Sequence, residues 1–536
     1  MTISFHHHFR EGDMVLNMVL DAIAKKGIKD ITVAASAFFN VHEPIIQHIK
    51  NGVVTALEGS CNGKIGYAVS KGLPLKKPVI LRSHGGRVRA IWSGELKIDV
   101  AFIAAPEIDP YGNMNGVNGP SACGPLAYAK ADAMFADQVV AITDNLVGYP
   151  ACPISIPQYY VDYIVPVDKI GDPDKIVAGT TRITTSPTSL LIARRCANFI
   201  ANHPDFHNGF SFQAGAGSIS LATTVFLRGI MKERGVVASF VNAGSTRYVI
   251  EMLEEETTRN ILEGQVFDKA AIESLRTNPR HQEMDIDFYA NYFNSGNVVD
   301  LLDFGVLGST EIDLNFNVNV NTHSDGLLLH GIGGHQDVAS GASTTIITQP
   351  LLRNRLGCVT DEVVTVTTPG DTVDVLITEY GVSIKTAGTP EMFISNACSG
   401  IIELLDTSFQ ISPESILRCI GVLNPSLIHG GNVGNNICSR LNIQFRDERE
   451  EIPLLADVYK DSMEGLYKIL LNLMFFCLKI ECGTPEDVEQ VINRGFRNKI
   501  EFIADADKTQ YHALTAGSNI IIRNAIAHAS WEPNWS

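Results

Sequence analysis

The sequence predicts an α/β protein with two similar domains, each built on an open, mostly parallel sheet, followed by a helix-rich C-terminal region. Three observations lead to this prediction. Short apolar runs alternate with segments of helical periodicity. Two sets of turn motifs recur at almost the same spacing along the chain. Beyond Thr386–Pro390 the strand-like runs give way to helical patterns. The two similar domains are expected to face each other across a cleft.

The apolar runs have the length and composition of strands that are buried on both faces. Four of them in the first half are Ile31–Ala35, Pro78–Leu81, Val100–Ala104 and Val139–Ile142. Parallel sheets covered by helices on both sides contain such continuous apolar strands. Ligands of open parallel sheets bind beyond the carboxyl ends of the strands. Because His-rich, Gly-rich and Asn-rich turns follow apolar runs in this chain, we expect these turns at that edge.

The beginnings of the two halves match. Thr2–Phe5 leads through a His-rich turn into a predicted helix, whose apolar face is formed by Leu16, Val19, Leu20 and Ile23. Gly209–Phe212 leads through Gln213–Ser218 into a second predicted helix, with Phe226, Leu227 and Ile230. Phe5 corresponds to Phe212, 207 residues later. Both helices are expected to end at a glycine, Gly27 and Gly235.

A second match is sharper. Glu107, Asp109, Asn113 and Asn115 recur 204 residues later as Glu311, Asp313, Asn317 and Asn319. Two matches at nearly the same offset indicate a duplicated domain. The two glutamates are candidate general bases, but their duplication fits structural roles in the two turns at least as well. The predicted domains span residues 1–178, 179–386 and 387–536, and Thr484–Asp487 in the last one has the composition of a helix start.

Composition and charge exclude several classes of protein. The net charge of −17 and the pI of about 5.3 disfavour nucleic acid and anionic membranes as partners, because both need a basic face. The ten cysteines form no CxxC or zinc spacing, which predicts reduced thiols, no metal site and a cytoplasmic protein. Consecutive His6, His7 and His8 would point to alternate sides of a strand, which argues against zinc. The first residues form no signal peptide, and Leu466–Ile480 is too short and too charged to span a bilayer.

The stretch that says most about chemistry is Leu328–Asp337, which contains the turn Gly331-Ile332-Gly333-Gly334. Glycines let the backbone approach a ligand closely or adopt positive φ. Exposed backbone N–H groups in such a turn can stabilise negative charge on a reacting oxygen. The turn follows Glu311 and the alternating asparagines Asn315, Asn317 and Asn319. Together these features point to acyl-group transfer.

Six segments connect the chain to a known family: Met1–Arg10, Ser83–Val88, Trp92–Phe102, Glu311–Val320, Ser324–Gly326 and Gly331–Asp337. With them, residues 1 to about 382 resemble the alpha subunit of citrate lyase, a citrate:acyl-carrier-protein transferase with the family I CoA-transferase fold. The resemblance implies two domains of the CoA-transferase type. It implies citrate and acetate as small-molecule partners, and an oligomeric complex with the acyl carrier (gamma) and citryl lyase (beta) subunits. It implies no tightly bound cofactor, the CoA-like thioester arm of the carrier being a co-substrate.

The resemblance also bears on mechanism. Many enzymes of this fold use a glutamate nucleophile that becomes a covalent thioester. The resemblance places that residue within Gly235–Gly244, which contains neither Glu nor Asp and in which Phe240 is nearest to the expected slot. It therefore implies direct attack of a citrate carboxylate on the acetyl thioester, through a mixed anhydride. The protein would then supply orientation and stabilisation of an oxyanion.

The resemblance and the residue types together define an expected site. Candidates for catalysis are Gly333, Gly334, His335 and Glu311. Candidates for binding the substrate are Ser83, His84, Gly85, Gly86, Arg87, His7, Arg10 and Asn113. Candidates for receiving the thioester arm are Gln213, Gly215, Gly217, Ser218 and Gly331. Among them, Arg87 offers a guanidinium fork that fits a carboxylate, and the helix after Gly217 could hold a phosphate at its N-terminus.

Several alternatives stay open. His335 could fix the turn instead of contacting substrate, and the Gln213–Ser218 loop could serve packing alone. A CoA-transferase or thioester hydrolase for another acid is a second possible function, which the missing glutamate and the Ser83–Val88 segment disfavour. A non-catalytic scaffold that holds partner subunits is the third.

Overall fold

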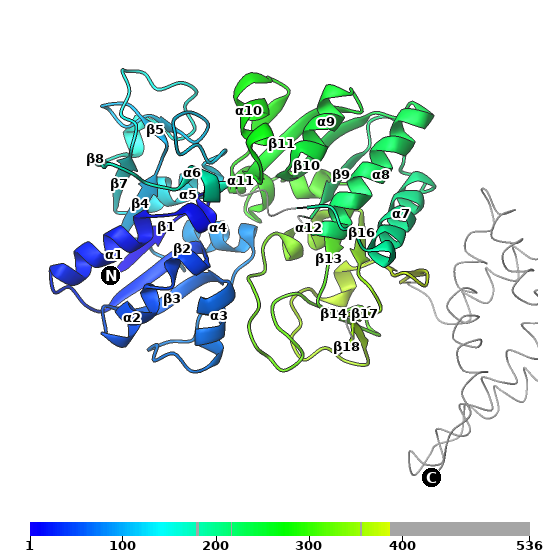
Figure 1. The fold of residues 1–536 in the computed structure, drawn as a ribbon, viewed down its shortest axis with the longest axis horizontal. Coiled ribbons are helices and arrows are strands. Elements are labelled where there is room, and N and C mark those ends of the chain that lie inside the picture. Colours follow the sequence, from blue (N-terminus) through cyan, green and yellow to red (C-terminus); the bar gives the residue numbers. More distant parts are fainter. Residues whose placement is uncertain (178–181, 216, 354–355, 386–536) are drawn as a thin grey trace, which may run out of the picture. The chain divides into compact units, whose positions relative to one another are not determined.

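The computed structural model describes residues 1–177, 182–215, 217–353 and 356–385. Contacts divide the chain into one unit from Met1 to Glu379 and a second from Tyr380 onward. The first unit contains two parallel sheets, which lie in separate lobes coloured blue to cyan and green to yellow (Figure 1). The predicted fold class of two α/β domains with parallel sheets is therefore confirmed. The predicted helix-rich region 387–536 lies outside the described residues, and the boundary near residue 178 stays a prediction.

The first sheet has the strand order β3-β2-β1-β4-β7-β8, and all of its neighbouring strands are parallel. Its strands are β1 (Thr2–Phe5), β2 (Ile31–Phe38), β3 (Val54–Cys61), β4 (Val100–Ala104), β7 (Gln138–Thr143) and β8 (Tyr163–Pro166). The helices of this domain are α1 (Val15–Lys25), α2 (Ile45–Lys50), α3 (Gly63–Ser70), α4 (His84–Trp92), α5 (Ala127–Phe135) and α6 (Pro173–Ile176). A short hairpin, β5 (Glu107–Ile108) and β6 (Met114–Asn115), follows β4.

The second sheet has the order β12-β11-β10-β9-β13-β16-β20 within the first unit, and all of these neighbouring strands are likewise parallel. Its strands are β9 (Ser211–Ala214), β10 (Ala238–Ser245), β11 (Thr258–Val266), β12 (His281–Glu283), β13 (Phe304–Gly308), β16 (Thr344–Thr348) and β20 (Val375–Ile377). Its helices are α7 (Pro187–Ala201), α8 (Ser218–Arg234), α9 (Arg247–Glu254), α10 (Lys269–Thr277), α11 (Ile286–Ala290) and α12 (His335–Gly341). Three short strands form a small separate sheet: β14 (Glu311–Asp313), β15 (Val318–Asn319) and β19 (Val359–Thr360). Two more, β17 (Leu352–Arg353) and β18 (Leu356–Gly357), pair antiparallel. The last described strand is β21 (Val382–Ile384).

The order of the strands confirms the duplication. Strands β3, β2, β1, β4 and β7 have the same neighbours as β11, β10, β9, β13 and β16. The predicted helix ends are confirmed as well: α1 stops two residues before Gly27, which has φ +70°, and Gly235 caps α8 with φ +65°. A left-handed glycine after the last turn satisfies carbonyl groups that the helix leaves open.

The recurring Glu-Asp-Asn-Asn motif has the same structure in both halves. Asp109 accepts hydrogen bonds from the backbone of Gly112 and from Asn113, and Asp313 accepts them from the backbone and side chain of Asn317. Glu107 pairs with Asn115 across β5 and β6, and Glu311 pairs with Asn319 across β14 and β15. In both cases the asparagine amide donates to the glutamate carboxylate, at 2.8 and 2.9 Å. The motif therefore shapes a tight turn after a sheet strand.

One predicted strand is wrong. Pro78–Leu81 forms no strand; only Ile80 makes an isolated bridge, to Glu58. The place in the sheet belongs to β3, whose polar Thr55, Glu58 and Ser60 hide its strand character in the sequence. The five cysteines in the described part are unpaired. No helix in that part is long and apolar enough to cross a bilayer.

Candidate active site

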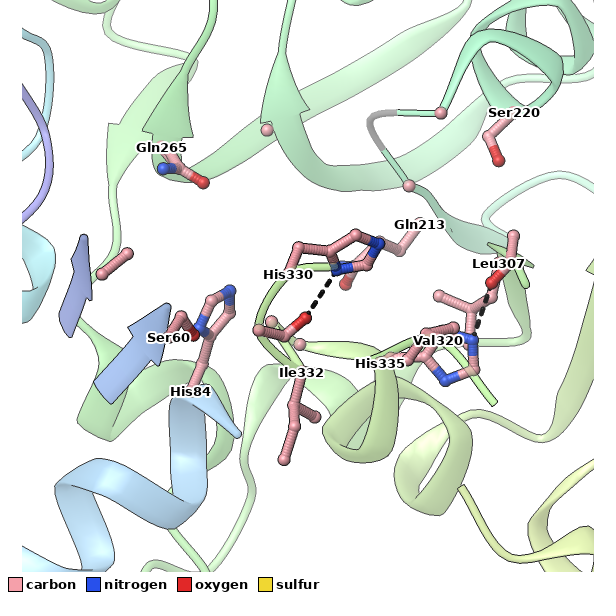
Figure 2. Close-up of a pocket in the computed structure, with 18 of the residues that line it drawn as sticks. Ser60, His84, Gln213, Ser220, Gln265, Leu307, Val320, His330, Ile332 and His335 are labelled. Atoms are coloured by element: carbon pink, nitrogen blue, oxygen red, sulfur yellow. Dashed lines mark hydrogen bonds between the residues drawn. The ribbon is translucent and has the colours of Figure 1, made fainter. Parts of the chain in front are cut away.

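A cavity of about 700 Å³ lies between the two domains of the first unit. Its walls are the segments that follow or end β1, β2 and β3 on one side and β9, β10, β11 and β13 on the other. These are the carboxyl ends of parallel strands, as expected for ligand sites in such sheets. Figure 2 shows side chains from both domains directed into this space, among them His84, Gln213 and Gln265.

The Gly331–Gly334 turn lies in the cavity wall. Gly331 must be glycine because a Cβ there would stand 1.8 Å from Oγ of Ser60 in β3. Its N–H donates to Oδ1 of Asn62 at 3.3 Å, which ties the turn to the first domain. Gly333 has φ +66°, a conformation that side chains disfavour. Among the described residues, none accepts a hydrogen bond from the N–H of Gly333 or Gly334. The turn thus presents backbone donors that await an acceptor.

His335 holds the turn in place. Its Nε2–H donates to the carbonyl of Gly308 at 3.0 Å, so its Nδ1 accepts from the hydroxyl of Thr368 at 2.7 Å. Burial lowers the pKa of His335 to about 4, which keeps the ring neutral. Both ring nitrogens are therefore engaged within the protein, and the geometry supports the turn-fixing interpretation of this residue.

The Ser83-His-Gly-Gly-Arg segment starts helix α4 and joins the two domains. Ser83 caps the helix by accepting from the N–H of Gly86, and its hydroxyl donates to Asp337 of α12 at 2.7 Å. Asp337 also accepts from the N–H of Gly85 at 3.1 Å. A Cβ on Gly85 would stand 2.0 Å from the carbonyl oxygen of Ala290, so glycine is required for α4 to approach α11. Of this segment only His84 lines the cavity.

Arg87, expected to bind substrate, lies outside the cavity and is already paired within the first domain. Its guanidinium donates to both carboxylate oxygens of Asp132, at 2.7 and 3.1 Å, and to the carbonyl of Ala34. The side chain is buried below α4 and does not line the cavity. A guanidinium that already holds a bidentate carboxylate has no fork left for another one. Arg87 is thus paired within the first domain, Ser83 and Gly85 bind Asp337 of the second domain, and Gly86 donates to the capping Ser83.

Glu311 and Asn113 are also outside the cavity. Glu311 accepts hydrogen bonds from Asn319 and Ser324. The amide of Asn113 donates to Asp109 and to Gln158. Both residues shape the duplicated turns described above, and the structure does not bring Glu311 or Asn113 together with the residues that line the cavity.

Arg10 is the cation most deeply placed in the cavity wall. It sits behind β1 with φ +51°, and its guanidinium stacks on the ring of Phe267, 4.1 Å from the ring centroid. One guanidinium nitrogen donates to the carbonyl of Val266, and Nε is buried with no partner among the described residues. No carboxylate in the described part of the chain pairs with it, and burial lowers its pKa to about 10. A partly buried guanidinium without a carboxylate partner favours an anionic ligand.

His7 lies beside Arg10 and is neutral, because burial lowers its pKa well below 6.5. The amide of Gln265 donates to its Nε2 at 2.7 Å, so Nδ1–H donates to Oγ of Ser36 at 2.6 Å. The ring is therefore held between the two domains by one bond to each. His7 contributes a fixed wall instead of a free donor.

The segment that follows β9 forms the opposite wall. Gln213 donates to the hydroxyl of Tyr289 and accepts from Asn242, and the N–H of Gly215 donates to Val306. Gly217 caps α8, a helix of 17 residues, and Ser218 begins it. Gln213, Gly215, Gly217 and Ser218 all line the cavity, together with Gly331. The candidates for receiving the thioester arm are thus the group that the structure brings together most completely.

No carboxylate lines the cavity in the described part of the chain. The window Gly235–Gly244 contributes Asn242 and Gly244 to the wall. A Cβ on Gly244 would stand 1.8 Å from the ring of Phe267, the ring on which the guanidinium of Arg10 stacks. An aromatic ring and a guanidinium therefore fill the space that a longer side chain at this position would need.

Several lining residues were not expected from the sequence. They are Ser60, Asn62, Tyr128, Tyr289, His330 and Arg353. Ser60 and Asn62 stand at the end of β3, the strand that the apolar pattern misses. His330 precedes the glycine turn directly and is the one that sequence reasoning could have included, since it belongs to the same segment.

Comparison with known proteins connects this site to a family. The family described as citrate lyase, alpha subunit, matches residues 1–398. The citrate lyase alpha chain of Haemophilus influenzae is 48% identical over 386 residues, which is 72% of this chain and 77% of that one. The Klebsiella pneumoniae chain is 47% identical over 388 residues, 72% and 76% of the two chains.

Comparison with solved structures points to the same family. The alpha subunit of citrate lyase from Streptococcus mutans, in complex with citrate, is similar with a TM-score of 0.70 and 51% identity over 72% of this chain and 76% of that one. A Pseudomonas malonate decarboxylase is similar with a TM-score of 0.55 and 14% identity, over 72% and 78% of the chains, which shows a shared fold alone.

Proposed function

The chain belongs to the citrate lyase alpha subunit family, and from this premise we propose that it is the citrate CoA-transferase of a citrate lyase complex. It exchanges the acetyl group of an acetyl-thioester carrier protein for citrate, which gives citryl-carrier and acetate. The observation that carries the mechanism is a cavity with backbone donors and a buried cation but no lining carboxylate among the described residues.

The reaction proceeds in two exchanges. A carboxylate oxygen of citrate attacks the carbonyl carbon of the acetyl thioester, the C–S bond breaks, and the carrier thiolate leaves with the electron pair. The product is a mixed citric–acetic anhydride. The thiolate then attacks the citryl carbonyl carbon of that anhydride, the bond between this carbon and the bridging oxygen breaks, and acetate leaves with that oxygen. The two exchanges together neither take up nor release a proton, and no group on the protein is acylated.

The glycine turn stabilises the charge that develops in both exchanges. Each attack turns a carbonyl oxygen into an oxyanion, and the N–H groups of Gly333 and Gly334 have no other acceptor in the described part of the chain. Preorganised donors of this kind contribute about 2.7–4 kcal/mol each to the barrier in known enzymes. His335 supports them by fixing the turn to Gly308 and Thr368.

Arg10 recognises a carboxylate of citrate. Its Nε is buried without a partner, its guanidinium lies against Phe267, and no carboxylate among the described residues pairs with it. Citrate carries two carboxylates besides the one that attacks, so a fixed cation orients the substrate for attack. The citrate complex of the Streptococcus mutans relative supports citrate as the acyl acceptor.

The thioester arm of the carrier enters along Gln213–Ser218. Gln213, Gly215, Gly217 and Ser218 line the cavity, and Ser218 begins α8, a helix whose N-terminus attracts an anionic group. Arg353, on the same side of the cavity, offers a second cation. No tightly bound cofactor is needed. The partners are the acyl carrier and citryl lyase subunits in an oligomeric complex, and the unpaired cysteines of the described residues suit the cytoplasm.

One assay tests the function. The purified chain is mixed with acetylated carrier protein and citrate, and citryl-carrier and acetate are followed together. Equimolar formation of both is expected. Hydroxylamine or borohydride trapping under the same conditions should leave the chain without a bound acyl group or reduced glutamate. Carrier binding without turnover would refute the enzymatic function and favour a scaffold, and a trapped acyl-enzyme would refute the direct attack.

A further inference from the structure

His84 reaches the cavity from the first domain and stops beside the glycine turn of the second. Its Nε2 lies 3.8 Å from the point where a Cβ on Gly333 would stand, and its Cδ2 lies 3.1 Å from the corresponding point on Gly334. Figure 2 shows the imidazole directed into the cavity from the start of α4. The residue thus brings a ring with two nitrogens to the place where the backbone donors of the turn are exposed.

The position of His84 is fixed from both domains. Its own N–H donates to the carbonyl of Gly333 at 3.1 Å. The residues on either side, Ser83 and Gly85, donate to the same buried carboxylate of Asp337 at 2.7 and 3.1 Å. The ring contacts the edge of Tyr128, with centroids 5.0 Å apart. The imidazole is therefore held against the turn by backbone contacts that do not involve its nitrogens.

The ring nitrogens themselves are not engaged. Neither nitrogen of His84 has a hydrogen-bond partner among the described residues, in contrast to His7 and His335, whose nitrogens are all occupied. Burial alone lowers the pKa of His84 to about 4. The ring is neutral near pH 7 and carries one N–H that can be donated into the cavity.

We propose that His84 donates this N–H to the oxyanion formed at the glycine turn, so that the oxyanion site is assembled from both domains. The proposal rests on the proposed function, since it assigns a role within that reaction. It makes His84 a catalytic residue: the imidazole contacts the reacting oxygen, together with the N–H groups of Gly333 and Gly334.

The reaction leaves His84 no role in proton transfer. The attacking carboxylate of citrate is already ionised at neutral pH, so no base is required. The leaving thiolate attacks again in the second exchange, so no acid is required either. A neutral imidazole that donates a hydrogen bond to a developing oxyanion stabilises the transition state without changing its own protonation state.

Two substitutions test the proposal. His84→Phe keeps a flat ring against Tyr128 and removes the donor, and His84→Gln keeps an N–H donor and removes the ring. With the full chain, acetylated carrier and citrate, His84→Phe should lower kcat by about 10²–10³-fold. Its KM values for citrate and for the carrier should stay within about threefold. His84→Gln should lie within about tenfold of the unchanged chain. His207→Gln, at an exposed histidine outside the cavity, is the matched control.

Circular dichroism and thermal unfolding of each variant establish that it is folded. A folded His84→Phe variant with kcat within threefold of the unchanged chain overturns the proposal. So does a rise in KM with constant kcat, which would make His84 a substrate-binding residue only, and so does a His84→Gln variant as slow as His84→Phe. Absence of turnover in the unchanged chain, by contrast, is the failure of the proposed function itself.

Discussion

Replacement of Gly331 by alanine should disable the active site by displacing the turn. The added Cβ would stand 1.8 Å from Oγ, 2.1 Å from Cβ and 2.9 Å from Cα of Ser60. Ordinary contact begins at 3.4 Å, so the turn and β3 must separate by about 1.6 Å. The backbone donors of Gly333 and Gly334 move with the turn. A misplacement of about 1 Å costs roughly 10²-fold in rate, so kcat should fall at least that far.

The same geometry predicts a specific rescue. Ser60→Gly removes the two closest atoms and leaves Cα at 2.9 Å, which reduces the required shift to about 0.5 Å. Ser60→Ala removes only Oγ and leaves Cβ at 2.1 Å. The effect of Gly331→Ala on kcat should therefore shrink to less than about tenfold in the presence of Ser60→Gly and stay near 10²-fold in the presence of Ser60→Ala.

Initial rates of citryl-carrier formation, measured for the three single variants, the two double variants and the unchanged chain, test both expectations. Overpacking of this kind costs about 1–3 kcal/mol of stability, so denaturant unfolding must show that each variant is folded at the assay temperature. An equal effect of Gly331→Ala with and without Ser60→Gly would refute the steric reasoning. Activity of Gly331→Ala within threefold of the unchanged chain would refute the role of the turn.

Three further predictions follow from the electrostatics. Arg10→Met should raise the KM for citrate by about 10–100-fold, the loss of one charge-assisted hydrogen bond, and leave the KM for the carrier unchanged; initial rates against each substrate measure both. Arg87→Met should lower the free energy of unfolding by about 3–5 kcal/mol, because Asp132 is left buried and unpaired, without changing the citrate KM of the folded chain; urea titration and rates test this. Burial raises the pKa of Asp337 from 3.8 to about 6, so the folded chain holds its proton more tightly than the unfolded chain. Stability relative to Asp337→Asn should therefore fall by about 2–3 kcal/mol as pH rises from 4 to 7, and a rise or a flat profile in urea titrations would contradict the shift.

The sequence carried most of the fold. Runs such as Val100–Ala104 became central parallel strands, and the repeated acidic–asparagine motif marked equivalent turns in both halves. The duplication was visible because the turn chemistry requires those side chains at those spacings. Strand β3 was missed because its carboxyl-terminal part carries Glu58, Gly59 and Ser60, of which Ser60 lines the active-site cavity and the other two line a small pocket beside it. Polar residues near the cavity therefore hide the apolar pattern by which this strand would be recognised in the sequence.

The site was predicted less well than the fold, for a reason that two arginines illustrate. Arg87 and Arg10 both stand in segments typical of the family, and both could bind a carboxylate. Which of them is left without a carboxylate partner depends on residues remote in sequence: Asp132 of α5 pairs with Arg87, whereas Arg10 stacks on the ring of Phe267. The spacing of residues along the chain does not predict which side chain will contact each arginine. The glycine turn, by contrast, can be recognised from the sequence alone, because a run of glycines is what such a backbone turn requires.

The two halves share a strand order, but the equivalent loops that line the cavity differ in their residues. The loop after β1 and the loop after β9 occupy equivalent places in a pseudosymmetric backbone. One copy carries histidines and Arg10, while the other carries Gln213 and glycines. A symmetric pair of loops would have accepted donor and acceptor in either orientation. In the proposed function this difference between the two copies orients the reactants, with citrate on the Arg10 side of the cavity and the thioester on the Gln213 side.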